Sequence, residues 1–348
     1  MTLILKSSEA INIKNMADEK ILMDSSKLNY RLYDSIPKSA EKVEAENPEI
    51  LMKCMKNPVE IENIRKAQIK DSVAHVRFMK WVKDTYQTGA ITELNAAEKL
   101  DELREEMGDF VRPSFDPICA LGEHAAMCHY SSSPETNVVL SEGNLFLTDT
   151  GAGFMEGSTD ITRTYALGEV PQIMKEHFTL VAISNLRLAN VKFLKGCVGL
   201  NLDIIARQPF WERGLNYNHG TGHGVGYLLN IHEGPAGLRW QHRVGEIQEL
   251  LPGMILTDEP GIYIEGSHGI RLENELLVCE GEKNEYGQFM YFDTLTFVPM
   301  DLDAIDETVM TAEDKKLLNA YHQNVYKQVS PYLNEEEKEW LKRYTREI

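Results

Sequence analysis

Hydrophobic residues recur at helical spacing behind a complete helix start signal. Asn57 stands at the N-cap position, Pro58 at the first helical position and Glu60 at the third. The apolar stripe that follows consists of Ile61, Ile64, Ile69, Val73 and Val76. This pattern predicts a long helix that extends to about residue 82 and opens a new domain.

Three further helices and five strands are predicted downstream. One helix follows Thr92 and ends at Gly108, and the others cover 172–195, ended by Gly196, and 202–213. The β-type runs are 144–150, 160–167, 253–258, 270–278 and 290–299. Strands in hairpins with long helices between them predict an α+β domain from about residue 55 to 310. The charge-rich tail from Thr311 is predicted to be helical and solvated.

Composition narrows the class of protein. The chain has 348 residues, of which 43% are hydrophobic and 26% charged, as in a soluble globular protein with a true core. The net charge of −18 argues against a nucleic-acid binder and against an anionic membrane surface as partner. No run of about 18 apolar residues suggests a membrane span. A soluble enzyme or a binding protein is expected.

The cysteines and the first residues predict a cytoplasmic location. The five cysteines are scattered and form no CxxC pair: Cys54, Cys119, Cys128, Cys197 and Cys279. This spacing fits neither a disulfide framework nor a zinc ribbon, so a reducing compartment is the simpler interpretation. The apolar run before Lys6 is too short for a signal-peptide core.

Two acidic hairpins carry the first candidate chemistry. Asp149 and Asp160 flank a glycine-containing turn, and a simple hairpin would place them opposite one another. Facing side chains have Cβ atoms about 5 Å apart, so two ionised carboxylates there need a cation or a shared proton. A surface hairpin with solvated acids is the alternative.

The second hairpin repeats this arrangement. The midpoint of Glu259 and Glu273 is Gly266, again inside a glycine-containing turn. Both acids are expected within strands of Ile, Leu and Val. Inward-pointing carboxylates in such strands are costly unless they are paired or bound to a metal.

A glycine-rich segment adds three histidines: His219, His223 and His232. Its four glycines between residues 219 and 226 make a helix implausible, which excludes a helical HExxH zinc motif. A phosphate-binding GxGxxG would need glycine at Val225. We therefore expect the glycines to let the backbone approach a ligand, with the histidines lining that space. Structural roles for single histidines are the alternative.

Four carboxylates and one histidine form a ligand set for two divalent cations. Oxygen-rich ligation with one imidazole suits manganese, cobalt or iron better than structural zinc. Two metals about 3.5–4 Å apart can share a bridging hydroxide and polarise a carbonyl oxygen. Metal-assisted hydrolysis is therefore expected, whereas the absence of a GxSxG elbow disfavours a serine hydrolase.

The segments TDTGAG…STDITRT, HGTGHGVG, TDEPGIY and GIRLENE together resemble the pita-bread metallopeptidases. The resemblance is strongest to the aminopeptidase P (Xaa-Pro aminopeptidase) branch, and it covers roughly residues 20 to 348. It implies the pita-bread (creatinase/aminopeptidase) fold with two pseudo-symmetric halves. It also implies hydrolysis of the N-terminal Xaa-Pro bond of peptides through a metal-bridging hydroxide.

The resemblance also implies roles for individual residues. Asp149 and His223 would each bind one metal ion, Asp160 and Glu273 would bridge both, and Glu259 would ligate and act as general base. His129, His219, His232 and Arg271 match substrate-site positions; His219 and His232 match proline-pocket and proton-shuttle histidines, and Arg271 a ligand-orienting arginine. The implied cofactors are two divalent ions, most simply Mn²⁺, with Co²⁺, Fe²⁺ or Zn²⁺ as alternatives.

The same resemblance suggests a domain division. Residues 1–54 look like the C-terminal stub of a preceding creatinase-type domain, 55–310 like the catalytic domain and 311–348 like a helical tail. Peptides with proline at the second position are the implied partners, without nucleic acid or membrane, and a homodimer is a family-level expectation. A prolidase, which cleaves only Xaa-Pro dipeptides, and a non-catalytic binding module are the alternatives. Methionine aminopeptidase and creatinase are disfavoured by the motifs present.

Overall fold

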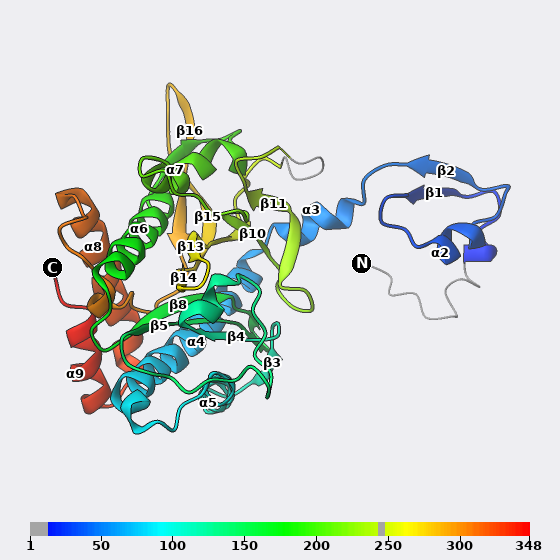
Figure 1. The fold of residues 1–348 in the computed structure, drawn as a ribbon. Helices are drawn as coiled ribbons and strands as arrows, with labels where there is room; N and C mark the ends of the chain where they lie inside the picture. The colour runs from blue at the N-terminus through cyan, green and yellow to red at the C-terminus, as the bar shows by residue number, and fades with distance from the viewer. Residues whose placement is uncertain (1–12, 243–247) are drawn as a thin grey trace. The chain divides into compact units, whose positions relative to one another are not determined.

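A computed structural model describes residues 13–242 and 248–348. The chain divides into two compact units, one ending at Lys53 and one running from Cys54 to Ile348 (Figure 1). The expectation of a cytoplasmic location rests partly on residues 1–8, which lie outside the described residues. No helix in the described residues is long and apolar enough to cross a membrane.

The described part of the first unit, residues 13–53, contains few buried apolar residues. Strand β1 (Lys20–Met23) pairs in parallel with β2 (Glu41–Glu44), and α2 (Tyr30–Ser35) lies between them in sequence. Its buried apolar residues are Met23, Ile36 and Ala40. Helix α3 (Pro48–Cys54) follows. The interpretation of this segment as the end of a preceding domain stays a prediction.

The two first predicted helices of the second unit are confirmed. Helix α4 (Pro58–Thr85) begins at Asn57, whose side chain accepts hydrogen bonds from the backbone N–H groups of Val59 and Glu60. The Glu60 carboxylate in turn accepts from the Asn57 backbone N–H, which completes a capping box. Helix α5 (Glu93–Glu105) begins in the same way at Thr92.

The third predicted helix is shorter than expected. Helix α6 spans Gln172–Ala189, and residues 192–194, expected to be helical, instead form β9 (Lys192–Leu194). Strand β9 pairs with β16 (Gly287–Thr294), and the Phe193 ring lies 5.1 Å from that of Phe292. Tertiary pairing with a distant strand therefore overrides the local helical pattern. Helix α7 (Gly199–Trp211) agrees with the prediction within a few residues.

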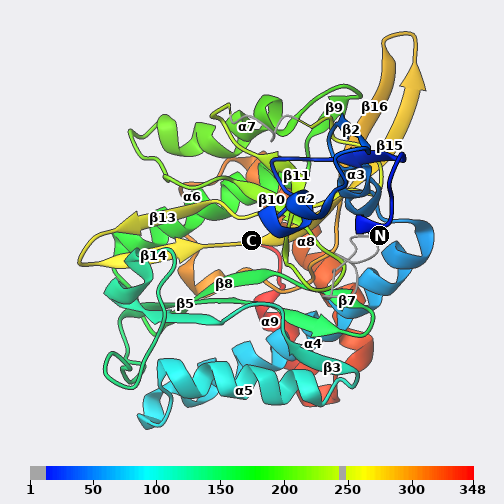
Figure 2. The ribbon, with the colours of Figure 1, turned by 90° about the vertical axis from the view of Figure 1, so that its right-hand side faces the viewer.

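The strands form several small sheets rather than one. The sheet that holds the first acidic hairpin has the order β4 (Ile118–Leu121), β5 (Asn144–Thr150), β8 (Ile161–Leu167). A second three-stranded sheet contains β3 (Phe110–Pro113), β6 (Ala152–Phe154) and β7 (Gly157–Ser158). The six-stranded sheet runs β11 (His232–Leu238), β10 (Gly222–Val225), β12 (Ile255–Asp258), β15 (Asn274–Asn284), β16, β9. Strands β13 (Gly261–Ile264) and β14 (His268–Arg271) form a pair, and the hairpin of β15 and β16 projects outward (Figures 1 and 2).

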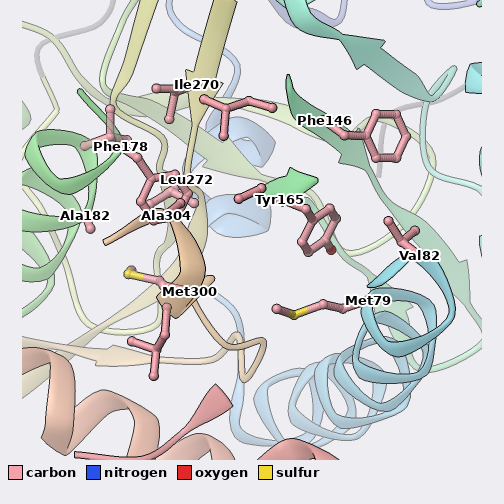
Figure 3. Close-up of a cluster of buried hydrophobic side chains, with 14 of the residues drawn as sticks. Met79, Val82, Phe146, Tyr165, Phe178, Ala182, Ile270, Leu272, Met300 and Ala304 are labelled. Carbon is pink, nitrogen blue, oxygen red and sulfur yellow. The ribbon is translucent and has the colours of Figure 1, made fainter. Parts of the chain in front are cut away.

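The sheets and helices enclose one main core. Helix α4 packs on α5, and α6 packs on α7, so that each half of the unit has a helix pair beside antiparallel strands (Figure 2). Figure 3 shows Met79 and Val82 of α4 on the same side of the core as Tyr165 of β8. Phe178 of α6 lies beside Leu272 in the same cluster (Figure 3). This core holds the edges of the acidic strands in place.

The C-terminal tail is not a solvated end piece, so that expectation is wrong. Helix α8 (Ala312–Val329) and α9 (Glu335–Tyr344) contribute to the main core, in which Leu318 and Val325 are fully buried. The Tyr321 hydroxyl accepts a hydrogen bond from the buried Arg163 guanidinium at 2.7 Å. Most charged residues of α8 are exposed, although Asp314 is buried and pairs with Arg187. The prediction weighed this charge and missed the apolar stripe on the buried side of the helix.

We therefore expect Leu318→Ala to destabilise the whole second unit. Removing a fully buried leucine side chain costs about 2–5 kcal/mol of unfolding free energy, whereas Lys316→Ala should change it by less than about 0.5 kcal/mol. The Lys316 side chain is 76% exposed on the same helix. Urea unfolding of both variants measures the difference, and equal midpoints would contradict the buried position of α8.

Candidate metal centre

The first acidic hairpin does not have the predicted register. Asp149 pairs with Thr162 and Thr150 with Ile161, so Asp160 lies just outside the ladder instead of opposite Asp149. The intervening residues fold into β6 and β7, which pair with each other, and β6 also pairs with β3. A Cβ atom added to Gly151 would lie 2.1 Å from the Ser114 hydroxyl oxygen and the Thr159 carbonyl oxygen. Gly151 therefore lets the chain pass close to Ser114 and Thr159, where a larger residue would not fit, and the simple hairpin is replaced by the longer path of residues 151–159.

The second acidic hairpin has the predicted register. Asp258 pairs with Asn274, and Gly261 pairs with Arg271, so Glu259 and Glu273 stand opposite one another. The two acids do not lie inside strands, however, because the ladder of β12 and β15 ends before them and that of β13 and β14 begins after them. The expected strand 270–278 is accordingly broken at residues 272 and 273.

Neighbouring strands hold the two glutamates at this break. The Glu259 backbone N–H donates to the Thr221 carbonyl at 2.8 Å, and that of Glu273 donates to the Thr162 carbonyl at 3.0 Å. The Thr162 hydroxyl also donates to the Glu273 carboxylate at 2.7 Å. Each acid is thus fixed by a strand other than its own hairpin partner.

His223 lies on β10, in the glycine-rich segment. A Cβ atom at Gly222 would lie 1.8 Å from the Thr257 carbonyl oxygen, and one at Gly224 would lie 2.0 Å from that of Glu233. The glycines therefore let β10 approach its neighbouring chain segments closely. Their expected approach to a ligand stays a prediction. The His223 Nδ1 atom lies 2.9 Å from the Gly224 carbonyl oxygen, to which it donates, so Nε2 is left as the ligand atom.

Three predicted ligands come together closely. Asp160, His223 and Glu273 offer ligand atoms that all lie within 4.8 Å of one another. His223 Nε2 is 3.4 Å from Asp160 Oδ2 and 3.8 Å from Glu259 Oε1, which places a fourth predicted ligand, and third acid, beside the cluster. The fifth predicted ligand, Asp149, instead accepts a short hydrogen bond from Arg271 through Oδ2. Its Oδ1 atom is buried without a hydrogen-bond partner in the described residues.

The electrostatics of this arrangement favour a cation. Burial raises the pKa of Asp160 well above its ordinary value, and the neighbouring Asp149 and Glu259 carboxylates raise it further. Burial and the Asp160 carboxylate likewise raise the pKa of Glu273. Buried acids this close repel one another unless protons or cations neutralise them. Together with the unpartnered Asp149 oxygen and the free His223 Nε2, these residues fit divalent cations.

The remaining predicted site residues surround the acids. Arg271 contacts Tyr263 as well as Asp149; its Nη1 atom donates to the Tyr263 hydroxyl at 2.7 Å. The His219 Nδ1 lies 2.7 Å from the Gly220 carbonyl oxygen, and burial lowers the pKa of the ring to about 3. The exposed ring of His232 lies 4.2 Å from that of His223, edge to face. His129 is exposed and close enough to depress the pKa of both His219 and His232.

Several supporting residues were missed in the sequence. Glu275 accepts a hydrogen bond from the Asp160 backbone N–H at 2.8 Å. Glu275 stands two residues after Glu273, so the alternation of a strand could have placed both on one face. Asp258 is buried, and neither of its carboxylate oxygens has a hydrogen-bond partner in the described part of the chain.

A buried ion pair fixes the turn between β10 and β11. The Lys56 ammonium lies 2.7 Å from the Glu233 carboxylate, and it donates to the Val225 carbonyl at 2.5 Å. Lys56 precedes α4, whereas Glu233 follows His232 directly. The start of the second unit is therefore tied to the segment that carries His223 and His232.

The comparisons with known proteins agree with this geometry. Residues 62–280 match metallopeptidase family M24, and residues 288–348 match the C-terminal region of peptidase M24. A probable Xaa-Pro aminopeptidase P of Botryotinia fuckeliana (strain B05.10) is 36% identical over 343 residues, which are 97% of this chain and 52% of that protein. Xaa-Pro aminopeptidase 2 of Rattus norvegicus is 36% identical over 330 residues, 94% of this chain and 48% of that protein.

Solved structures show the same fold. The crystal structure of X-prolyl aminopeptidase from Caenorhabditis elegans has a TM-score of 0.87 at 33% identity, covering 98% of this chain and 56% of that one. The prolidase from Pyrococcus furiosus has a TM-score of 0.65 at 27% identity, covering 84% of this chain and 79% of that one.

The architecture is thus the pita-bread fold of metallopeptidases, as the sequence resemblance implied. The chain belongs to metallopeptidase family M24. It spans about half the length of the curated relatives it matches.

The buried acids predict a pH-dependent stability for the metal-free protein. Burial raises the pKa of Glu275 to about 8, whereas an unfolded glutamate titrates near about 4.3. As the pH rises between these values, the unfolded chain loses this proton before the folded one. The free energy of unfolding should therefore fall between about pH 5 and pH 8, with up to about 1.4 kcal/mol per pH unit from this group.

Glu275→Gln should flatten this slope, because it removes the titration while keeping an oxygen to accept from Asp160. Glu280→Gln, at an exposed position of the same strand, is the matched control. Chemical unfolding in the presence of a chelator, at several pH values, measures both slopes. A Glu275→Gln slope equal to that of the control would contradict the assignment.

Proposed function

We propose that the chain hydrolyses the N-terminal Xaa-Pro bond of peptides with the help of two divalent cations. The observation that carries the proposal is the cluster of Asp160, His223 and Glu273, in which both acids are buried, with Glu259 beside it. The Caenorhabditis elegans protein is described as a cytosolic enzyme with a di-nuclear active site, and the fungal and rat relatives are named Xaa-Pro aminopeptidases. These names support the substrate class for this chain.

Five residues would hold the cations: Asp149, Asp160, His223, Glu259 and Glu273. The four positive charges of two divalent cations would balance the four carboxylates, which otherwise repel one another. Mn²⁺ suits this oxygen-rich set with one imidazole, and Co²⁺, Fe²⁺ and Zn²⁺ are the alternatives. Bound there, the cations supply Lewis-acid polarisation of the scissile carbonyl and acidification of water.

Glu259 is the proposed general base. Burial raises the pKa of its carboxyl group, while His223 and Arg271 lower it. The Thr257 hydroxyl donates to Glu259 Oε1 at 3.1 Å and fixes its orientation. Its carboxylate is therefore positioned to take the proton of the attacking water.

The histidines are proposed to bind the substrate and to move a proton. His219 is neutral at physiological pH because burial lowers its pKa to about 3. Its Nε2 atom is buried without a partner in the described residues, so it is available to accept a hydrogen bond at the wall of a proline pocket. His232 lies exposed beside His223 and would return the proton to the leaving amine, and His129 would contact the substrate near it. Arg271 would orient Asp149 through their ion pair.

Location and assembly follow as proposals from the same relatives. We infer a cytoplasmic enzyme because the Caenorhabditis elegans neighbour is cytosolic and no described helix could cross a membrane. A homodimer is proposed on the family resemblance. Neither nucleic acid nor a membrane is proposed as a partner, since the net charge is −18. A non-catalytic module is disfavoured because all five ligand residues are present.

The purified chain loaded with Mn²⁺ is expected to release the first residue of an Xaa-Pro-Xaa tripeptide. An Xaa-Pro dipeptide separates this activity from that of a prolidase, which remains a candidate because prolidases share the fold. Release should be followed by chromatography of the products. Hydrolysis of the dipeptide alone would assign a prolidase, and no hydrolysis by a chain with stoichiometric metal would remove the peptidase proposal.

Glu259→Gln is expected to lower kcat by about 10²–10⁴-fold, the usual contribution of general-base catalysis. The variant keeps an oxygen for the Thr257 hydroxyl and should retain the fold and much of the metal. Metal content by elemental analysis and kcat on the tripeptide are the measurements. Near-wild-type turnover with metal bound would exclude Glu259 as the base.

A further inference from the structure

We propose that the buried ion pair of Asp71 and Arg104 is a positioning device that fixes Asp149 and Asp160 relative to one another. Through this spacing it would set the affinity of the site for divalent cations. The inference rests on the proposed function, because it takes both aspartates as metal ligands. Asp71 and Arg104 touch neither the acids nor the histidines of the site in the described contacts.

The pair lies on two helices behind the acidic strands. Asp71 of α4 is fully buried and Arg104 of α5 is 1% exposed. Arg104 Nε is 2.8 Å from Asp71 Oδ1, and Nη2 is 3.2 Å from Oδ2, a two-point contact. Such contacts hold both geometry and orientation more strictly than a single charge pair does.

Each partner of the pair then contacts one threonine. Arg104 Nη2 donates to the Thr150 hydroxyl oxygen at 3.0 Å, and the Thr159 hydroxyl donates to Asp71 Oδ2 at 2.5 Å. Thr150 directly follows Asp149, and Thr159 directly precedes Asp160. One ion pair is therefore hydrogen-bonded to the residue next to each aspartate.

The contacts of Thr150 and Thr159 lie on the side of the chain opposite to that of the two aspartate side chains. Successive residues of extended chain point to opposite sides, so fixing Thr150 fixes the side to which Asp149 points. The Thr159 hydroxyl oxygen also accepts from the Ala152 backbone N–H at 2.8 Å. Residues 151–159, which stand in place of the simple hairpin, are thus held together at their two ends by Thr159, which also contacts the ion pair.

Stability alone does not explain why Asp71 and Arg104 are buried at this place. Burying an ion pair gains little over apolar residues of similar volume, because both charges lose their hydration. His75, also buried, lies 3.3 Å from Arg104 Nη2 and 3.5 Å from the Thr150 hydroxyl oxygen, which enlarges the polar group further. A device that holds two ligands to within a few tenths of an ångström, as metal sites require, accounts for it.

The test compares Thr159→Val with Thr159→Ser. Valine has the shape of threonine but cannot donate to Asp71, whereas serine keeps the hydroxyl. We expect Thr159→Val to weaken Mn²⁺ binding by about 10–100-fold, the usual effect of removing a group that orients a ligand. Thr159→Ser should restore the affinity to near that of the wild type. Calorimetric titration of the metal-free full chain with MnCl₂ gives the dissociation constants.

Two controls separate positioning from general destabilisation. Asp101→Asn alters an acid that lies 3.2 Å from the same arginine but contacts neither threonine. Leu100→Ala loosens the packing of α5 at a fully buried position without touching the ion pair. Both should bind Mn²⁺ as the wild type does, even where Leu100→Ala lowers the unfolding temperature more than Thr159→Val.

The outcomes are distinct. Wild-type affinity in Thr159→Val, or the same loss in Leu100→Ala, would overturn the positioning role while leaving the metal site intact. A wild-type chain that binds no stoichiometric Mn²⁺ would overturn the proposed function and the positioning role with it. If Thr159→Val does not fold, Thr150→Val against Thr150→Ser provides the same comparison at the other aspartate.

Discussion

Repulsion among buried carboxylates is the constraint on which the rest of the second unit depends. Asp160, Glu259 and Glu273 lie around the His223 imidazole, and burial raises the pKa of all three acids. A chain folds with such a cluster only if the surrounding structure forces the acids together. That force comes from backbone hydrogen bonds between strands and from the main core, in which α4, α6 and α8 all take part. The acids of the cluster therefore repel one another, and a bound cation would remove this repulsion. In this way part of the free energy of folding contributes to the affinity for metal.

The acids occupy the places where regular structure stops. Glu259 and Glu273 stand between two ladders of the same register, and Asp160 lies just outside the ladder of β5 and β8. A residue inside a strand has its backbone groups committed to its two neighbours. At a break the backbone can instead bond to a third strand, as Glu273 does with Thr162, and the side chain can be aimed independently. This geometry lets Asp160, His223 and Glu273, which come from distant parts of the sequence, offer ligand atoms within 4.8 Å of one another.

Features that are determined by residues close together in the sequence were predicted correctly, whereas features that depend on distant residues were not. The capping box of Asn57, the period of α4 and the mirror symmetry of Glu259 and Glu273 about Gly266 are local, and all three are confirmed. The register of Asp149 with Asp160 depended on β3, more than thirty residues upstream, and was predicted wrongly. Residues 192–194 became a strand because of β16, and the buried side of α8 depended on contacts with Arg163. The five candidate ligands could be named from the two acidic hairpins, the glycine-rich segment and the motif resemblance. The fold was required to show that Asp160, His223 and Glu273 come together.

The contact between Tyr321 and Arg163 has a consequence for the order of assembly. Arg163 Nη1 donates to the Glu273 carbonyl at 2.6 Å, and its Nη2 donates to the Tyr321 hydroxyl. During synthesis the segments that carry the acids emerge before α8 does, because they precede it in the sequence. Chains generally begin to fold from the N-terminal side. Until Tyr321 arrives, the Arg163 guanidinium lacks one of its buried acceptors. The hydrogen bonds of Arg163, one of which holds the Glu273 backbone, are therefore complete only after α8 has been synthesised.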